Sequence, residues 1–165
     1  MIYVMCPDYN VASAGVRTLY RHVDILNASG IDACILHESI GFSCTWFSHS
    51  TRLAYTPVYP TQEDLVVIPE IYGHRVQYLF PSSKKVIFNQ NTSNTFSACS
   101  NVSYLSSNLF GVVAGSEEIK DYLEYAFPGL EVASTCYSIY PTNFYFGDNK
   151  KRQIAYLTNK RQQDI

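Results

Sequence analysis

The fold is decided by the first 37 residues, MIYVMCPDYNVASAGVRTLYRHVDILNASGIDACILH. A short apolar run at residues 2–5 breaks at a Pro-Asp step and is followed by a loop of small residues. Apolar side chains then recur at helical spacing over residues 16–26, and Ser29-Gly30 closes the predicted helix. A second apolar run occupies residues 33–36. This order and these lengths predict a βαβ unit with two parallel strands.

The same alternation continues along the chain. Apolar runs predict strands at residues 65–68, 85–88, 111–114 and 132–139, with a short helical turn at 73–79 and an amphipathic helix at 119–127. Residues 39–60 have no clear period, and we expect a long loop there with one irregular strand. Strands that are nearly continuous apolar runs indicate an α/β fold, a Rossmann-like parallel sheet with helices on both faces.

Length and composition bound the organisation and the class. The chain has 165 residues, enough for one full-sized domain, and 47% of them are hydrophobic. Its net charge of -2 disfavours a nucleic-acid partner, because such proteins are normally basic. We expect a domain over residues 1–140, a linker over 141–152 that is rich in turn-forming and basic residues, and the first strand of a truncated second domain at 153–165.

The cysteines and histidines show no framework. The five cysteines form no C-x-x-C pair, and the four histidines show no paired spacing, so the sequence predicts neither a metal site nor a bound cofactor. An odd number of cysteines favours a reducing compartment. The chain lacks a signal-peptide pattern and an apolar run long enough to cross a membrane. We therefore expect a cytoplasmic location, with the inner face of a membrane as a second site.

Polar residues follow the predicted strands. In parallel sheets ligands bind at the carboxyl ends of the strands, so these residues form a candidate rim. The rim comprises Asp8, His37, Glu38, Glu70, Asn89, Gln90, Asn91, Ser116 and Glu117. Its many neutral donors and acceptors suit a polyhydroxy ligand. The alternative is that the same residues serve only as turn formers and helix caps.

Four positions have specific candidate roles. Gly15 permits close backbone approach, and Arg17 in the first turn of the helix suits an anion contact, or else is a solvated side chain or an ion-pair partner of Asp8. Glu70 is a candidate general base or a surface acid. Ser116 sits where a nucleophile elbow would, but the elbow glycines are incomplete, which favours a helix N-cap.

A family resemblance extends over almost the whole chain. The order of its sequence segments resembles that of GT-B glycosyltransferases near family 4, in which a glycine-rich loop leads into the first helix. The segments that carry it are 14–30 (AGVRTLYRHVDILNASG), 66–73 (VVIPEIYG), 86–91 (VIFNQN), 113–123 (VAGSEEIKDYL) and 151–161 (KRQIAYLTNKR). The resemblance implies one half of a GT-B fold.

By this resemblance the protein would transfer a sugar from a nucleotide-sugar donor to a hydroxyl of a glycan or small-molecule acceptor, without a bound metal. Gly15 and Arg17 would lie in the glycine loop, and Glu70, Asn91 and Ser116 would line the acceptor side. Basic residues near the start of the second domain, Lys160 and Arg161, would contact the donor phosphates. No catalytic residue is assigned.

The chain departs from the family pattern in three places. Ala14 replaces a frequent first glycine, Asn89-Gln90-Asn91 stands where a histidine is often found, and the paired-glutamate motif of the second domain is absent. The chain is therefore expected to be inactive without a C-terminal domain or partner chain. The alternatives are a non-catalytic α/β binding module that pairs with a separate donor-domain chain, and an unrelated hydrolase that uses Ser116.

Overall fold

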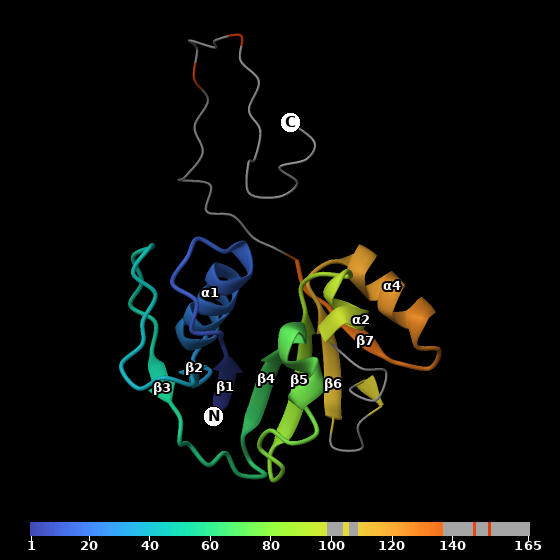
Figure 1. Ribbon diagram of the computed structural model, residues 1–165, viewed down its shortest axis with the longest axis horizontal. Helices are drawn as coiled ribbons and strands as arrows, with labels where there is room; N and C mark the ends of the chain where they lie inside the picture. The colour runs from blue at the N-terminus through green and yellow to red at the C-terminus, as the bar shows by residue number, and fades with distance from the viewer. Residues whose placement is uncertain (99–103, 106–108, 137–146, 148–151, 153–165) are drawn as a thin grey trace.

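The computed structural model describes residues 1–98, 104–105, 109–136, 147 and 152. Within them, seven parallel strands form one sheet in the order β3-β2-β1-β4-β5-β6-β7 (Figure 1). The strands are β1 (Ile2–Met5), β2 (Ala33–His37), β3 (Leu53–Tyr55), β4 (Leu65–Pro69), β5 (Lys84–Asn89), β6 (Leu109–Ala114) and β7 (Val132–Ser134). The helical elements are α1 (Ala14–Ala28), the 3-10 helix η1 (Glu70–Arg75), α2 (Asn94–Ala98) and α4 (Glu117–Ala126). The predicted Rossmann-like α/β fold is confirmed.

The sheet order reverses at β1. This strand pairs with β2 on one side and with β4 on the other, with Ile2 in register with Ala33 and with Leu65. The chain first builds outward to β3, then returns and builds outward in the other direction from β4 to β7. The carboxyl ends of β1 and β4 therefore form a topological switch point, the position where open α/β sheets bind ligands.

Helix α1 covers one face of the sheet. Its buried side chains, Val16, Leu19, Tyr20 and Val23, recur at the spacing of one helix face and pack with the inward residues of β1 and β2. Ser13 caps its start, because the side-chain oxygen accepts the Val16 N–H at 3.4 Å.

The predicted end of α1 is confirmed. Gly30 adopts a φ of 79°, which is the left-handed region that favours glycine just beyond a helix. Its N–H donates to the Asn27 carbonyl at 3.0 Å, so a carbonyl of the last turn has a partner.

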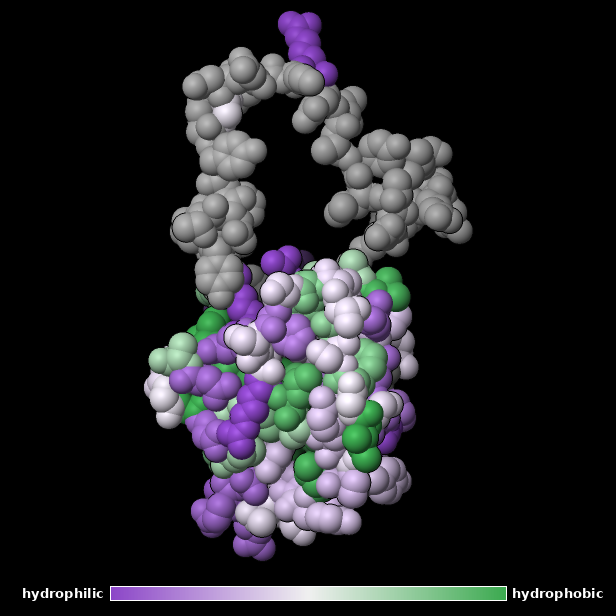
Figure 2. Space-filling view, turned by 90° about the vertical axis from the view of Figure 1, so that its left-hand side faces the viewer, coloured by the Kyte–Doolittle hydropathy of each residue, from purple (hydrophilic) through white to green (hydrophobic). Residues whose placement is uncertain are grey.

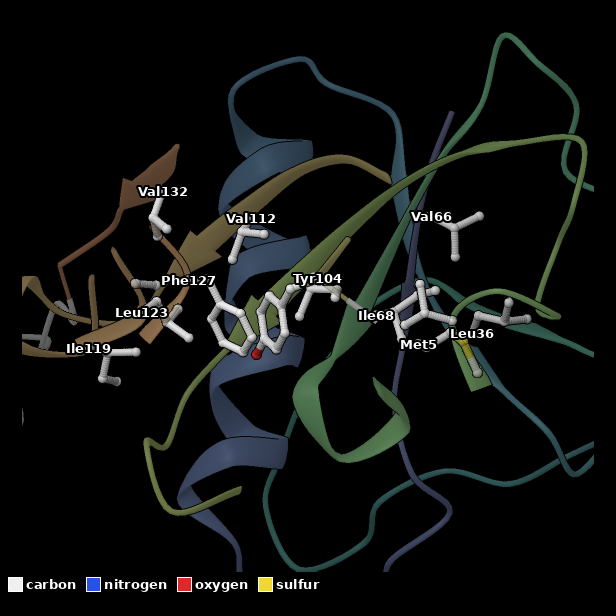
Figure 3. Close-up of a cluster of buried hydrophobic side chains, with 13 residues drawn as sticks. Met5, Leu36, Val66, Ile68, Tyr104, Val112, Ile119, Leu123, Phe127 and Val132 are labelled. Carbon is white, nitrogen blue, oxygen red and sulfur yellow. The ribbon is translucent and has the colours of Figure 1, made fainter. Parts of the chain in front are cut away.

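The opposite face carries the larger core. Alternate side chains of the central strands pack against α4, the segment after η1 and Tyr104 (Figure 3). Because both faces are covered, strands such as β2 are buried at all five positions. The residues of this cluster are Met5, Leu36, Val66, Ile68, Val76, Ile87, Tyr104, Val112, Ala114, Ile119, Leu123, Phe127 and Val132.

Two of the predicted boundaries were wrong. The helical turn begins at Glu70 instead of residue 73, because it follows β4 directly after Pro69. The last strand ends at Ser134 instead of residue 139, since β7 pairs only with β6 and buries only Val132. Residues 137–139 lie outside the described part of the chain, as do the predicted linker and second-domain strand except for residues 147 and 152.

The β3 side of the sheet is a protected edge. β3 has only three residues, and Arg52 next to it forms an ion pair with Asp32. The surface on this side mixes hydrophilic and hydrophobic side chains (Figure 2). Short edge strands with nearby charge resist pairing with another sheet.

In the part of the chain that the structure describes, none of the helices combines the length and the hydropathy needed to cross a bilayer.

The core of the larger face gives a first prediction. Leu123 is fully buried in α4, whereas Tyr125 on the same helix is 87% exposed. Leu123→Ala is expected to lower the free energy of unfolding by about 2–5 kcal/mol, because it removes buried methyl groups and leaves a cavity. Tyr125→Ala is expected to change it by no more than about 0.5 kcal/mol. Urea unfolding of both variants tests this, and equal losses would contradict the described packing.

Candidate functional site

The residues that follow the strands gather at one end of the sheet, here called the carboxyl edge. It is built from Asp8 after β1, the His37-Glu38 step at the end of β2, Glu70 after β4, and Gln90 after β5. All strands run parallel, so their ends lie on the same side of the molecule. The contacts described below join Asp8 to His37 on one side of the switch point and Glu70 to Gln90 on the other.

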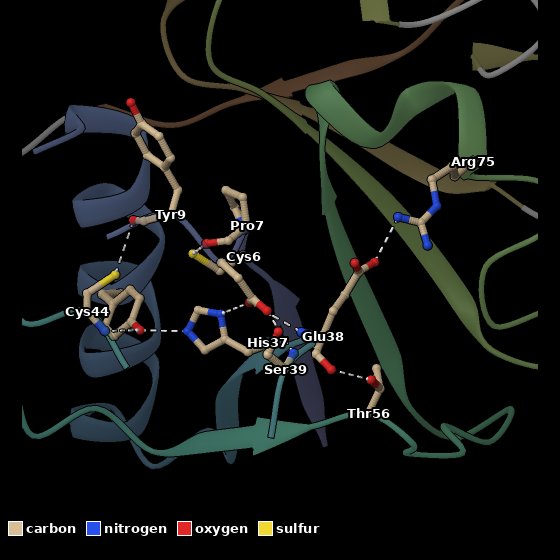
Figure 4. A network of polar contacts seen from close by, with 11 residues as sticks. Cys6, Pro7, Tyr9, His37, Glu38, Ser39, Cys44, Thr56 and Arg75 are labelled. Carbon is tan, nitrogen blue, oxygen red and sulfur yellow. Dashed lines mark hydrogen bonds and ion pairs between the residues drawn. The ribbon is translucent and has the colours of Figure 1, made fainter. Parts of the chain in front are cut away.

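A buried histidine joins three elements at the carboxyl edge (Figure 4). His37 is fully buried, with Nδ1 2.8 Å from Asp8 Oδ1 and Nε2 2.6 Å from the Tyr20 hydroxyl. Asp8 also accepts the backbone N–H groups of Ser39, at 2.7 Å, and Glu38, at 3.3 Å. One carboxylate thus holds together the end of β1, the end of β2 and the turn that follows it.

The proton positions in this network follow from its charges. Burial alone would raise the pKa of Asp8, but hydrogen bonds from Ser39 and His37 outweigh it and hold that pKa below its ordinary value. The ionised carboxylate makes His37 Nδ1 the donor, and burial lowers the pKa of His37, so Nε2 is free to accept the Tyr20 hydroxyl proton. The Tyr20 oxygen in turn accepts the Cys44 N–H at 3.4 Å. Every polar atom of the neutral histidine is satisfied.

An ion pair lies on the outer side of the same edge. Arg75 at the end of η1 donates to Glu38 Oε1 at 2.7 Å (Figure 4). Its guanidinium lies 5.6 Å from the centre of the Tyr72 ring. Thr56 donates to the Glu38 carbonyl at 2.7 Å. Both charges are about half exposed, so the pair adds little stability and mainly orients η1 against β2.

Glu70 organises the turn between β5 and α2. Only 2% of this residue is exposed, and its carboxylate accepts the Gln90 N–H and the Asn94 side-chain amide, both at 3.2 Å. Burial raises the pKa of Glu70, while these hydrogen bonds oppose the rise. The carboxylate therefore acts as an internal acceptor that fixes the turn, and in this position it is a positioning group.

A buried side-chain amide, that of Asn89, supports the same turn. Asn89 is fully buried at the end of β5, and its side-chain amide donates to Thr95 at 3.0 Å and to the Tyr104 hydroxyl at 2.6 Å. Its Oδ1 accepts the Asn91 N–H at 3.1 Å. The β5–α2 turn is thus held by Glu70 on one side and by Asn89 on the other.

Gln90 lies between these two supports and faces α1. A Cβ placed on Gly15 would be 3.6 Å from both Oε1 and Nε2 of Gln90, so the amide rests against the first turn of α1. Gln90 Oε1 is buried and has no hydrogen-bond partner among the described residues. A buried acceptor without a partner costs about 1–3 kcal/mol, so a hydrogen-bond partner from outside the chain would stabilise the Gln90 amide.

The residues predicted to bind substrate are not all brought together. Gly15 lies at the switch point beside Gln90, and Asn91 is exposed on the adjacent turn, where its side chain accepts the Ser93 N–H. Arg17 is exposed on α1. Ser116 caps α4, since its side-chain oxygen accepts the Ile119 N–H at 3.3 Å, which confirms the N-cap interpretation. Lys160 and Arg161 lie outside the described residues.

Sequence reasoning missed the partners in these networks. The sequence places His37 and Asp8 on the rim without a connection between them, and Tyr20 falls within the helical pattern of residues 16–26. No sequence pattern singles out Arg75. Each contact joins elements that the linear pattern does not relate, so only the aligned strand ends could have indicated them.

Two other features of the described residues bear on the site. A groove of about 520 Å³ lies between α2 and α4 and is lined mainly by apolar residues from Phe96 to Leu130. It has no acidic or basic side chain in its lining, so we place the functional site at the carboxyl edge instead. Among the residues that the structure describes, no group of three or more His, Cys, Asp or Glu side chains could hold a metal ion.

The histidine network predicts a pH dependence of stability. His37 has a lowered pKa in the folded chain, so below about pH 6.5 the unfolded chain binds the proton first and stability falls, by up to about 1.4 kcal/mol per pH unit. His37→Gln is expected to flatten this slope between about pH 5 and pH 7. It is also expected to lose about 1–3 kcal/mol at neutral pH, because Tyr20 loses its partner.

The measurement is urea unfolding at several pH values. His74→Gln serves as the control, because this histidine is exposed on η1. Burial also lowers the pKa of His22 and raises that of Glu70, and these contributions cancel in the difference between each variant and the parent chain. Equal slopes in the two variants would contradict the assignment.

The Glu70 contacts give a separate prediction. Glu70→Leu removes the acceptor for the Gln90 N–H and the Asn94 amide and is expected to destabilise the chain by about 1–3 kcal/mol. The rate of backbone amide hydrogen exchange is expected to rise more in the β5–α2 turn than elsewhere in the chain. Glu63→Leu, at an exposed position before β4, is the control and is expected to leave both quantities unchanged. Unchanged exchange in Glu70→Leu would refute the positioning role.

Comparison with known proteins adds no relative. No family model matches the chain, and no curated protein or solved structure matches it significantly. The fold and the contacts of the carboxyl edge therefore carry the functional argument. The resemblance to GT-B glycosyltransferases stands as a hypothesis on the residues quoted for it.

Proposed function

We propose that this chain forms the acceptor-binding domain of a glycosyltransferase that uses a nucleotide-sugar donor. The observation that carries the proposal is the meeting of Gly15, Glu70 and Gln90 at the switch point, where neutral amide groups surround a fixed carboxylate. Many unrelated functions occur on Rossmann-like sheets, so the sheet order alone supports little. The chemistry of this edge and the sequence resemblance support the same reading.

The edge is suited to binding more than to acid–base chemistry. Both carboxylates that flank the switch point, Asp8 and Glu70, are engaged by hydrogen bonds from the protein itself. A general acid or base must instead reach the reacting atoms of a substrate. We therefore assign these carboxylates to the architecture, and expect the reacting groups to come from the donor, the acceptor or a second domain.

Exposed apolar side chains accompany the polar groups at this end. They belong to segments that follow the carboxyl ends of β1, β2, β4 and β5, and they support a surface that a second domain or chain would cover. The residues are Tyr9, Val11, Ile40, Ile71 and Phe96. The same feature supports the second candidate, a binding module without catalysis of its own that pairs with a separate donor-domain chain.

Saccharide binding tests the proposal. Saturation-transfer NMR on the full chain with a panel of neutral mono- and oligosaccharides is expected to show binding in the millimolar range. Nucleotide-sugars are expected to bind more weakly, because the other domain would supply most of the contacts to the donor. Binding of nucleotides without any saccharide preference, or no saccharide binding at all, would overturn the proposal.

A matched pair of variants locates the binding. A Cβ at Gly15 would make ordinary contacts at 3.6 Å, so Gly15→Ala is expected to fold and to keep its affinity. Gly15→Val places a branched side chain against the Gln90 amide and is expected to weaken saccharide binding by about tenfold, the equivalent of about 1.4 kcal/mol. Equal affinities in the two variants would place the ligand elsewhere.

A further inference from the structure

Gln90 is the residue at the carboxyl edge whose side chain the rest of the fold does not explain. Its backbone is fixed, since the N–H donates to Glu70 and the preceding residue, Asn89, is fully buried and hydrogen bonded. Its side-chain oxygen is buried, and no partner for it exists among the described residues. Buried polar atoms nearly always have a hydrogen-bond partner, so this atom calls for one that the chain itself does not supply.

The position of the amide is set by three elements. Glu70 at the end of β4 holds the Gln90 backbone, β5 places the residue at its carboxyl end, and Gly15 at the start of α1 leaves room beside the amide. Both amide heteroatoms lie 3.6 Å from the Cβ position of Gly15, so neither is turned away from the helix. The amide is therefore held at the switch point, where ligands of open α/β sheets bind.

The chemistry of an amide selects the partner. In one orientation the unpaired atom is the oxygen, which accepts, and after rotation by half a turn it is the NH2 group, which donates. A hydroxyl group can satisfy either orientation, because it both donates and accepts. A carboxylate oxygen only accepts, and an ammonium group only donates.

We propose that Gln90 recognises a hydroxyl group of a neutral polyhydroxy ligand, with Glu70 as the positioning residue that holds it. The inference deepens the proposed function and rests on it for the location of the ligand at the carboxyl edge. It adds that selection at this point favours a hydroxyl over a charged group, because a charge that is removed from water beside an uncharged amide has no ion partner. A phosphorylated position of the ligand is therefore not directed at Gln90.

Side-chain amide resonances report on this contact directly. In an isotope-labelled sample of the full chain, the Gln90 NH2 resonances are expected to shift saturably when D-glucose or another neutral hexose is added. Acetate and methylammonium, the acceptor-only and donor-only probes, are expected to leave them unchanged. The resonances of Gln77, which is exposed on the segment after η1, serve as the internal control.

Substitutions measure the size of the effect. Gln90→Met keeps the length of the side chain but removes both polar atoms. It is expected to weaken hexose binding by roughly fivefold to tenfold, the loss of one neutral hydrogen bond. Gln77→Met is expected to leave the affinity unchanged. If Gln90→Met fails to fold, the resonance shifts in the parent chain still decide.

The outcomes separate this inference from the proposed function. If the hexose binds but the Gln90 resonances do not respond, the inference is overturned, and the proposal of an acceptor-binding domain still holds. If the resonances respond while no saccharide is transferred by the chain with any supplied donor domain, the inference stands and the transferase proposal fails. A partner that is only an ordered water predicts no response to any probe, and that result also overturns the inference.

Discussion

Pairing of β1 on both of its edges is the constraint on which this structure depends. The strand has only four residues, yet it joins β2 on one side and β4 on the other, and all three run parallel. A parallel sheet must be covered on both faces, so α1 packs on one face and α4 with the η1 segment on the other. The reversal of strand order at β1 follows, and with it the position of every polar group at the carboxyl edge.

Much of this fold could be predicted because its signals are local. β4, β5 and β6 are apolar runs that end at or next to a proline, an asparagine and a glycine, respectively. Ser116 and Gly30 mark helix ends by properties of single residues. β3 was predicted only as an irregular strand, because Leu53–Tyr55 is too short to show a period. β7 was overestimated because its apolar pattern continues beyond the point where β6 offers a partner.

The site was predictable in its location but not in its contacts. The residues after the strands were expected on one edge, and the parallel order placed them there. The partnerships of His37 with Asp8 and Tyr20, and of Glu70 with the Gln90 backbone, depend on register and on helix rotation. Sequence patterns do not encode these to within an ångström, whereas a hydrogen bond requires that accuracy. The unpaired oxygen of Gln90 is therefore a property of the fold and cannot be read from the sequence.

The two strands that pair with β1 are synthesised at different times. β2 leaves the ribosome soon after β1 and can pair with it across α1, but β4 begins only at Leu65. At roughly 5–20 residues per second, the other edge of β1 stays open for a few seconds while the segment between β2 and β4 is made. An apolar strand with a free edge is a template for wrong pairing. The order of strands that creates the carboxyl edge thus gives the nascent chain an interval in which a chaperone would be most useful.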